Sequence, residues 1–446
     1  MTYRNMHELV LLPLTPIHIG GGDEAKLMRS EYRIRDEHLE FISLKAVISA
    51  MKPVKQEQII KNMAKNLDST VTEILANADD EFVTGKVLLS PESAKELEGH
   101  HRKGGDGRSG QVDMFIRSGD KTTIPGSSLK GVLRTAWIAY QAREFNVPKT
   151  RDNGDLVKQA FKLANGGGNK MDTDPFRDVF VEDSFLPDNK TKIEFIHSWK
   201  KGKKGYSFGK LGQMHKELTH ALALGDKPLP ILVRIGLIDS EIRQMRGCKQ
   251  DSYKKTPSTT PSSLDEMLSA LNAHHEPLWK RESEKFFYGN KGKYFRQVLE
   301  LVSHINCKGD RPDAALIRIG WASHAESKSI AGFRRIERPQ IKGEGKIAKE
   351  GSARHVVKIG DNPLSLGWAL LVKKDKYVPP ATILSKPVGS YGIKYRKGSK
   401  IILDDEETAT LDEDVFYNDP PDKKVRIIFY GDTDFEAIHK IKGLAK

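Results

Sequence analysis

Residues 124–140 constrain the fold of this chain more than any other stretch. Pro125 and Gly126 form a turn, and Ser127 or Ser128 can cap a helix by accepting hydrogen bonds from its free backbone N–H groups. Apolar side chains then recur at helical spacing, at Leu129, Val132, Leu133, Ala136, Trp137 and Tyr140. The stretch therefore predicts a tight turn that leads into an amphipathic helix with one buried face.

The polar face of this helix carries Lys130 and Arg134, which lie one turn apart beside the helix N-terminus. Because the first N–H groups of a helix favour anions, one interpretation is a phosphate-binding site. The other is a capped helix with two solvated cations, and both interpretations fit the pattern. A Walker A loop is excluded, because apolar residues follow Gly131 where that motif has Lys and Ser or Thr.

The run from Pro125 to Thr135, Pro-Gly-Ser-Ser-Leu-Lys-Gly-Val-Leu-Arg-Thr, closely resembles a signature of the RAMP superfamily of CRISPR systems. Within that family the chain is most similar to the type III-A (Csm) effector subunit that caps the filament near the 3′ end of the guide RNA (crRNA). The similarity covers roughly residues 7–373. It implies an α+β RAMP fold with one or two ferredoxin-like (RRM-like) units, helical insertions and a small C-terminal β-rich appendix.

Net charge separates the appendix from the rest of the chain. The sequence has 446 residues, which suits two domains, and a net charge of +13. Residues 376–446 hold twelve Lys and Arg against twelve Asp and Glu, so the whole excess belongs to residues 1–375. A polyanion-binding surface is therefore expected in the first part. We predict an N-terminal RAMP unit at 1–228, a degenerate second RAMP half at 229–375 and an accessory segment at 376–446.

The cysteine content and the length of the apolar runs indicate the cellular compartment of the protein. Cys248 and Cys307 are the only cysteines, which excludes a disulfide scaffold and a cysteine-based zinc finger and fits a reducing compartment. No apolar run is long enough to cross a bilayer, and the N-terminus lacks an apolar signal core. We predict a cytoplasmic protein without membrane contact, metal or cofactor.

Several further elements follow from pattern alone. The alternation at 32–42 predicts a hairpin, with Ser43 capping the next helix, and residues 55–101 read as a helical insertion. A β–β–α opening of this kind suits a ferredoxin-like unit. Strands are expected at 9–14, 229–237, 314–320 and 364–373, helices at 264–273 and 294–304, and in the appendix a small β unit with a short helix from Asp434.

The first glycine-rich loop, Thr15-Pro-Ile-His-Ile-Gly-Gly-Gly-Asp23, resembles the first motif of the family. Its glycines allow a backbone to approach a ligand closely, so Gly20 and Gly21 are expected to contact RNA. His18 is expected to contact RNA as well. Its alternative role is that of a general base, as in guide-processing relatives, and a third interpretation is a hydrogen-bonded structural histidine.

Residues 197–216 mix six lysines with Trp199, Tyr206 and Phe208. This combination supplies phosphate contacts and stacking surfaces, as single-stranded RNA binding requires. From this segment Lys200, Lys201, Tyr206 and Phe208 are predicted to bind RNA. The competing interpretation is a basic loop whose aromatic side chains lie in the core.

Near the end of the RAMP region, the family has a glycine-rich loop that contacts RNA. Here only Gly320 and Gly332 frame the corresponding segment, so contacts are expected from the side chains Lys328, Arg334 and Arg335 instead. The start of the helix at 124–140 supplies the remaining predicted RNA contacts. They are Gly126, Ser127, Ser128, Lys130 and Arg134.

The resemblance implies a binding subunit that holds crRNA and caps a filament of related RAMP backbone subunits beside a small subunit. It also implies a part in crRNA maturation, with trimming by a separate host exonuclease, and in antiviral defence. The alternative is an endoribonuclease, either metal-independent with His18 as base or a metal-dependent target nuclease, for which Asp23 or Asp183 is the first candidate.

Overall fold

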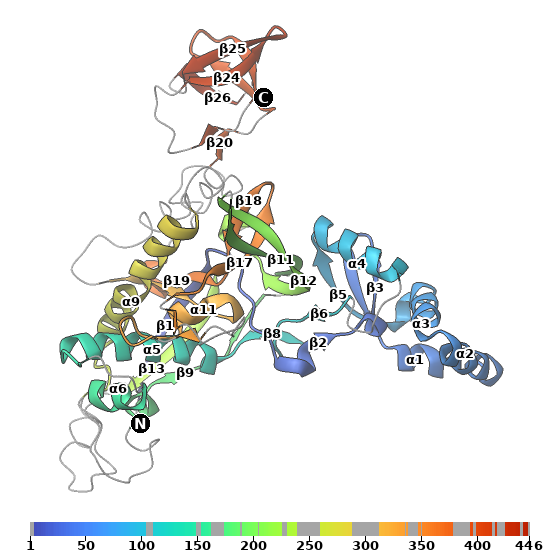
Figure 1. The fold of residues 1–446 in the computed structure, drawn as a ribbon, viewed down its shortest axis with the longest axis horizontal. Coiled ribbons are helices and arrows are strands. Elements are labelled where there is room, and N and C mark those ends of the chain that lie inside the picture. The colour runs from blue at the N-terminus through green and yellow to red at the C-terminus, as the bar shows by residue number, and fades with distance from the viewer. Residues whose placement is uncertain are drawn as a thin grey trace, which may run out of the picture.

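A computed structural model of the chain describes residues 4–103, 110–148, 153–161, 174–187, 190–203, 205–224, 230–238, 259–287, 312–334, 336–337, 347–348, 350–377, 393–395, 398–412, 415–416, 424–437 and 440–444. Figure 1 shows a central body with a helical insertion on one side and a small C-terminal β unit at the top. The predicted helix at 294–304 and the residue Arg335 lie outside the described residues.

A five-stranded antiparallel sheet in the order β14-β19-β1-β13-β9 forms the centre of the body. Its strands are β1 (Arg4–Pro13), β9 (Phe180–Val181), β13 (Ile231–Ile238), β14 (Ala314–Arg318) and β19 (Trp368–Lys373). Helix α5 (Gly126–Glu144) lies between β1 and β9 in the chain, and α9 (Leu264–Phe286) follows β13. Without β14, this is the chain and spatial order of a ferredoxin-like unit, which confirms the predicted α+β fold.

The two faces of this sheet bury different cores because side chains alternate along a strand. Leu9 and Leu11 of β1 pack with Leu133 of α5 and Leu271 of α9. Leu12 points to the other face, where the core contains three tryptophans, Trp199, Trp279 and Trp368. The helices therefore cover one face of the central sheet and a second sheet covers the other.

This second sheet has the order β2-β6-β12-β11-β5-β4-β3, and β17 and β18 extend it from β11. Its longest strands, β11 (Thr191–Gly202) and β12 (Gly205–Thr219), form a hairpin. The others are β2 (Lys26–Leu27), β3 (Tyr32–Arg35), β4 (His38–Ile42), β5 (Val83–Leu89), β6 (Val112–Asp113), β17 (Ala353–Ile359) and β18 (Asn362–Ser365). Short strands β7 (Arg117–Ser118), β8 (Lys121–Ile124) and β10 (Ser184–Phe185) form a small sheet beside it.

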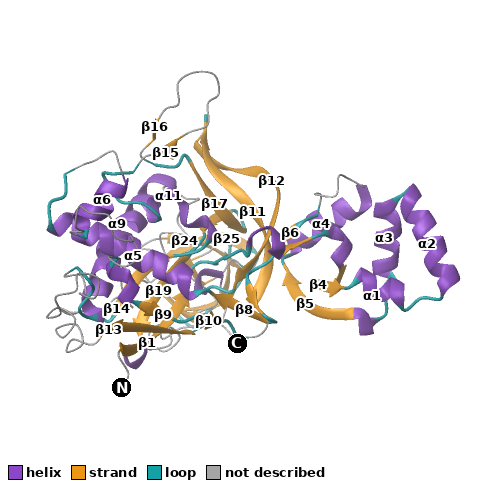
Figure 2. Cartoon of the chain, turned by 90° about the horizontal axis from the view of Figure 1, so that it is seen from below, coloured by secondary structure: helices purple, strands orange, loops and turns teal. Residues whose placement is uncertain are grey.

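The predicted hairpin at 32–42 is present as β3 and β4, and both of its turn residues, Asp36 and Glu37, have positive φ. It pairs with β5 rather than with β1, so it belongs to the insertion and does not open the ferredoxin-like unit. The expected insertion helices follow as α1 (Leu44–Ser49), α2 (Pro53–Lys65), α3 (Leu67–Ala76) and α4 (Pro91–Lys103). Figure 2 shows α1–α3 at the end of the molecule opposite α9.

The predicted boundary at 228/229 runs through the central sheet. β1, from the first predicted unit, pairs with β13 and β19, which both come from the second. The described residues of both predicted halves therefore share one ferredoxin-like sheet. Remaining elements of this body are α6 (Asn153–Ala160), α11 (His324–Ser327), β15 (Ile336–Glu337) and β16 (Ile347–Ala348).

The appendix folds as a β unit, as expected, but its predicted helix from Asp434 is wrong. Tyr430 and Gly431 both have positive φ and form a tight turn, after which the chain pairs back on β24 from Asp432 onward. The unit contains β20 (Ile393–Tyr395), β21 (Lys400–Leu403), β22 (Thr408–Leu411), β23 (Val415–Phe416), β24 (Lys424–Phe429), β25 (Asp432–Ala437) and β26 (Ile441–Leu444). Among the described residues, no helix combines the length and apolar composition that crossing a membrane requires.

Candidate nucleic-acid interface

A pocket of about 670 Å³ brings together three stretches that lie far apart in the sequence. Its lining comes from residues 18–26, 127–135 and 318–328, with Asp113, Met114 and Lys216 between them. We call this hollow the central pocket. Helices α5 and α11, which supply two of the stretches, lie side by side in Figure 1 and Figure 2. The glycine-rich loop, the helix start and the glycine-framed loop of the sequence therefore meet at one place.

His18 forms the back of the central pocket and is 4% exposed. Its Nδ1–H donates a hydrogen bond to the backbone carbonyl of Glu217 at 2.8 Å. Burial, with the positive charge of Lys216 nearby, lowers the pKa of His18 to about 4, so the imidazole is neutral at physiological pH. A neutral ring with Nδ1 protonated leaves Nε2 as a hydrogen-bond acceptor.

The predicted turn and helix at 124–140 are present, but the capping differs from the prediction. Helix α5 begins at Gly126, and neither Ser127 nor Ser128 makes a side-chain cap. The Gly126 N–H instead donates to the Asp183 carboxylate at 2.7 Å. A Cβ on Gly126 would lie 2.2 Å from the Val181 carbonyl oxygen, so the position requires glycine. The Gly126 N–H is thus bonded within the protein and its RNA contact stays a prediction, whereas Ser127 and Ser128 line the pocket.

The polar face of α5 does not line the central pocket. The Arg134 guanidinium donates to Asp174 at 2.6 and 3.1 Å and lies 5.5 Å from the ring centroid of Phe161. Lys130 is half-buried on the same side of the helix. Side chains at 127, 128, 131, 132 and 135 face the pocket instead. The phosphate contacts predicted for Lys130 and Arg134 therefore stay predictions and are separate from this pocket.

Lys216 is a cation of the central pocket lining that the sequence prediction did not select. Its ammonium forms an ion pair with Asp113 and lies 4.2 Å from the ring centroid of Trp321. Lys216 points into the pocket while its neighbour Glu217 points away, as strand alternation in β12 requires. The signal was present, since Lys216 is the last of the six lysines counted at 197–216.

Gly320 joins the third stretch to the first. It has φ of 94°, and a Cβ there would lie 2.4 Å from the backbone oxygen of His18. The N–H of the next residue, Trp321, donates to that oxygen at 2.8 Å. Lys328 is exposed and lines the pocket, as a phosphate contact requires. Arg334 instead donates to the Glu326 carbonyl and to Ser329 at 2.8 Å, so it holds the loop together.

At the glycine-rich loop, Gly20 is exposed and lines the pocket, whereas Gly21 is half-buried and lies beyond it. A Cβ on Gly21 would approach that of Ala25 to 2.9 Å, so packing favours glycine there. Asp23 also lines the pocket, and its exposed carboxylate pairs with Lys26. No group of three or more His, Cys, Asp or Glu in the described part of the chain is placed to hold a metal ion.

The basic aromatic segment forms the β11–β12 hairpin, and of its predicted RNA contacts none lines the central pocket, which the segment reaches through Lys216. Lys200 and Lys201 are exposed there. Tyr206 and Phe208 pack against the buried Trp199, with ring centroids 6.0 and 5.0 Å away. The interpretation of aromatics packed on the core therefore fits their placement, and their stacking on RNA stays a prediction.

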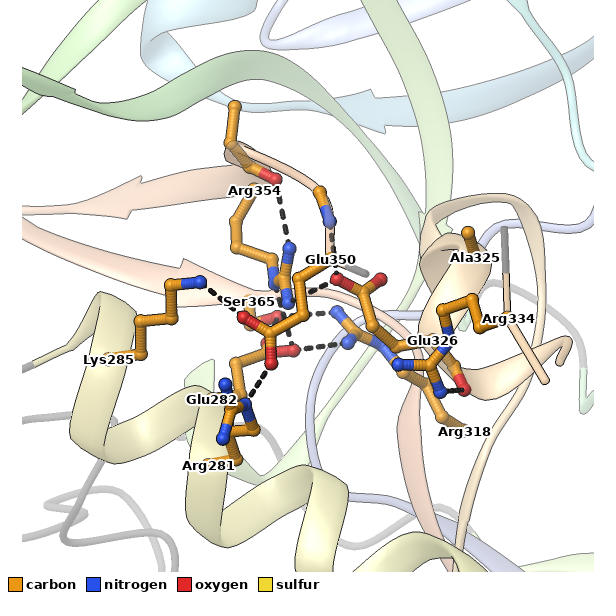
Figure 3. A network of polar contacts seen from close by, with 12 residues as sticks. Arg281, Glu282, Lys285, Arg318, Ala325, Glu326, Arg334, Glu350, Arg354 and Ser365 are labelled. Atoms are coloured by element: carbon orange, nitrogen blue, oxygen red, sulfur yellow. Dashed lines mark hydrogen bonds and ion pairs between the residues drawn. The ribbon is translucent and has the colours of Figure 1, made fainter. Parts of the chain in front are cut away.

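Behind the central pocket lies a cluster of buried charges, which we call the buried ion cluster (Figure 3). It consists of Glu282, Arg318, Glu326 and Arg354, whose side chains are at most 6% exposed. Glu282 pairs with both arginines and accepts a hydrogen bond from Ser365. Burial alone raises the pKa of Glu282, but the two arginines and Ser365 outweigh it and hold that pKa below its usual value.

The buried ion cluster fixes the wall of the pocket. Arg318 ends β14 and directly precedes the Gly320 loop, and Glu326 belongs to α11 in the same loop. Arg354 of β17 donates to both Glu282 and Glu326, at 3.0 and 3.1 Å. The third stretch of the pocket is therefore clamped to α9 and to the second sheet.

The family model described as "RAMP superfamily" matches residues 11–350. A curated relative, the "CRISPR system Cms protein Csm5" of Streptococcus thermophilus, is 27% identical over 206 residues, which are 43% of this chain and 55% of the relative. The match thus spans about half the length of that relative. The predicted resemblance is confirmed.

A solved structure shows the same fold. A chain of the "Cryo-EM structure of Csm-crRNA-target RNA ternary complex in type III-A CRISPR-Cas system" superposes with a TM-score of 0.56 at 15% identity, covering 82% of this chain and 100% of that one. The crystal structure of Csm5 from T. onnurineus gives a TM-score of 0.47 at 16% identity, covering 72% and 92%.

Proposed function

Because the chain belongs to the RAMP superfamily, we propose that it is a structural, crRNA-binding subunit of a type III-A CRISPR effector complex in the cytoplasm. It caps the filament of related backbone subunits at the crRNA 3′ end, beside a small subunit. In that position it protects bound crRNA and sets where a separate host exonuclease stops trimming. The complex it completes serves RNA-guided antiviral defence.

The observation that carries this proposal is the convergence of three sequence-distant, family-like stretches on the central pocket. The pocket offers what a single RNA strand requires: an exposed cation in Lys328, hydroxyl groups in Ser127 and Ser128, and an imidazole acceptor in His18. The positive end of the α5 dipole lies at the same wall. The names of the similar proteins agree with this assignment, since they describe Csm5 and a Csm–crRNA complex.

The alternative function is an endoribonuclease with His18 as general base. The geometry favours binding, because a pKa of about 4 makes the imidazole a weak base at neutral pH. Its Nδ1–H is already committed to the Glu217 carbonyl. Of the two aspartates considered for a metal-dependent reaction, Asp23 is paired with Lys26 and Asp183 is bonded to the start of α5.

The decisive experiment is affinity purification of the tagged full chain from its native cells, with native mass spectrometry of its partners and sizing of the bound RNA. We expect several related basic subunits and guide RNA of discrete length. A Lys328→Glu variant should recover less guide RNA, whereas Lys376→Glu, an exposed lysine outside the pocket, should match the unmodified chain. Recovery of the chain alone and free of guide RNA would contradict the proposal.

A His18→Ala variant separates the two functions. For a binding subunit, the change lowers RNA affinity modestly, and no cleavage is lost because none is present. For the alternative enzyme, RNA cleavage by the purified chain disappears in the variant. The thermal unfolding midpoint of the variant is measured beside it, since His18 also bonds to β12.

A further inference from the structure

Two more hollows lie between the central pocket and the insertion strands. One of them, which we call the connecting pocket, has a volume of about 550 Å³, and Ala25, Lys26 and Met114 line both it and the central pocket. The same connecting pocket shares Phe41 and Arg117 with a third hollow of about 660 Å³, which we call the lateral pocket. Through these shared lining residues the three hollows adjoin one another, from the start of α5 to strands β4 and β5.

The lateral pocket is basic. Lys86, Lys190 and Arg117 line it together with two imidazoles, and Asp120 is the one carboxylate among its lining residues. Lys86 is exposed and Lys190 is half-exposed. Within the described part of the chain, neither lysine has an ion pair. Their charges are thus available to an anionic ligand.

A rigid platform of an aromatic ring and a guanidinium stands where the lateral and connecting pockets meet. The Phe41 ring lies against Gly85, where an added Cβ would approach the ring to 3.0 Å. The Arg117 guanidinium carbon lies 6.0 Å from the ring centroid. Arg117 is held by the carboxylate of Glu217 at 2.7 Å and by the Phe115 carbonyl at 3.0 Å.

The carboxylate that holds Arg117 is itself fixed. Glu217 is completely buried and accepts hydrogen bonds from the Phe115 N–H at 2.9 Å and from the Thr191 hydroxyl at 2.6 Å. A buried carboxylate with three donors keeps its position, because moving it would leave these donors unpaired. The Arg117 guanidinium is therefore already ordered at the pocket wall, so that ligand binding costs little side-chain entropy there.

We propose that the lateral pocket is a second single-stranded RNA subsite, where Lys86 and Lys190 bind phosphate groups and a base stacks on Phe41. This inference rests on the proposed function, since it extends the strand that occupies the central pocket. The chemistry favours RNA over an acidic peptide, because the lateral pocket is linked to the central pocket through the connecting pocket and combines cations with a half-exposed ring. None of the family-like stretches supplies these side chains.

The test measures binding of a fluorescein-labelled 16-nucleotide oligouridine to the full chain across a salt titration. In Lys86→Ala/Lys190→Ala, the loss of two phosphate contacts should lower the salt slope of log K by about 1.4 and the affinity at 0.1 M salt by roughly 25-fold. The matched control is Lys400→Ala/Lys424→Ala, two exposed lysines of the C-terminal unit, which should bind like the unmodified chain. Equal thermal unfolding midpoints establish that all variants are folded.

A second readout locates the base. Oligouridine carrying 4-thiouridine should crosslink, on irradiation, to the peptide that contains Phe41, and Phe41→Leu should remove that crosslink. Unchanged affinity and slope in the double lysine variant would overturn the inference. If that variant instead kept its RNA affinity and lost only its protein partners, the pocket would bind protein and the inference would be wrong.

The two proposals fail in distinguishable ways. If the unmodified chain shows no salt-dependent RNA binding, both fail. If the unmodified chain binds RNA, Lys328→Ala weakens it and Lys86→Ala/Lys190→Ala does not, only the second subsite fails.

Discussion

The central pocket and the buried ion cluster both adjoin the loop at Gly320, and both contain cationic side chains. The cations have different roles in the two regions. In the cluster, Arg318 and Arg354 are almost fully buried and each is paired with glutamate. In the pocket, Lys328 is exposed, and Lys26 pairs with Asp23, which lies three residues earlier in the chain and is 93% exposed. Burial thus separates the cations that hold the fold, which include the paired Lys216 of the pocket, from the exposed Lys328, which remains for a ligand.

The energetics of the two regions differ for the same reason. A charge buried without its partner keeps the cost of leaving water, so breaking a buried pair typically costs about 3–5 kcal/mol. An exposed pair is screened by water and contributes roughly 0–1 kcal/mol. The comparison can therefore be tested by removing one partner in each setting.

The largest effect is expected for Glu282→Ala. This change leaves Arg318 and Arg354 without their shared carboxylate, and the free energy of unfolding should fall by about 3–5 kcal/mol. Glu8→Ala is the matched control, since Glu8 also pairs with two cations, Arg234 and Lys374, but at the surface. Urea unfolding of both variants checks the difference. Equal losses of stability would show that burial is not what separates the two regions.

The next effect concerns His18, which lies between the two regions. Its pKa of about 4 in the folded chain is below the usual 6.5, so the unfolded chain binds more protons between these values. Stability should therefore be constant above pH 6.5 and fall as the pH drops toward 4, with His18 contributing about 2–3 kcal/mol of that loss at pH 4.5.

His18→Gln isolates this contribution. Unfolding free energies of the variant and of the unmodified chain, measured at pH 7 and pH 4.5, should show a smaller acid loss in the variant. The remaining loss belongs in part to His274 and His355, whose pKa values burial also lowers to about 4. An identical acid loss in both proteins would mean that His18 is accessible to protons in the folded state.

Sequence predicted the segments of the central pocket but only part of their chemistry. The helix at 126–144 and the loop around His18 follow from local patterns, namely helical spacing and a proline–glycine context. Local patterns do not predict which face of that helix lines the pocket. Arg134 and Lys328 look alike in the sequence, and only the fold gives Arg134 the carboxylate of Asp174.

The role of a glycine cannot be predicted from the sequence for a similar reason. A glycine that approaches RNA and a glycine that approaches another strand leave the same trace in a sequence. Gly126 is required by the Val181 carbonyl and Gly320 by the backbone of His18, and both contacts join residues distant in the chain. The pairing of β1 with β13 and β19 across the predicted boundary at 228/229 is likewise non-local, so the sequence did not show that one sheet joins the two predicted halves.

A smaller effect is expected where the two regions are joined. Gly320→Ala places a Cβ against the His18 oxygen at positive φ, which should cost roughly 2 kcal/mol of stability. Gly360→Ala is the control, because it also has positive φ but no heavy atom within 4 Å of the added Cβ, so about 1 kcal/mol is expected. Urea unfolding compares them. If Gly360→Ala cost as much, the contact between Gly320 and His18 would be unimportant to stability.

The smallest effect on stability, and the clearest on binding, is expected for Lys328→Ala. Lys328 is exposed, so its removal should leave the unfolding midpoint unchanged. Loss of one phosphate contact should lower the salt slope for single-stranded RNA by about 0.7 and the affinity at 0.1 M salt roughly fivefold. Lys424→Ala, an exposed lysine of the C-terminal unit, should change neither quantity. A Lys328 variant that binds RNA normally but unfolds more easily would place this lysine with the buried ion cluster and erase the distinction between the two regions.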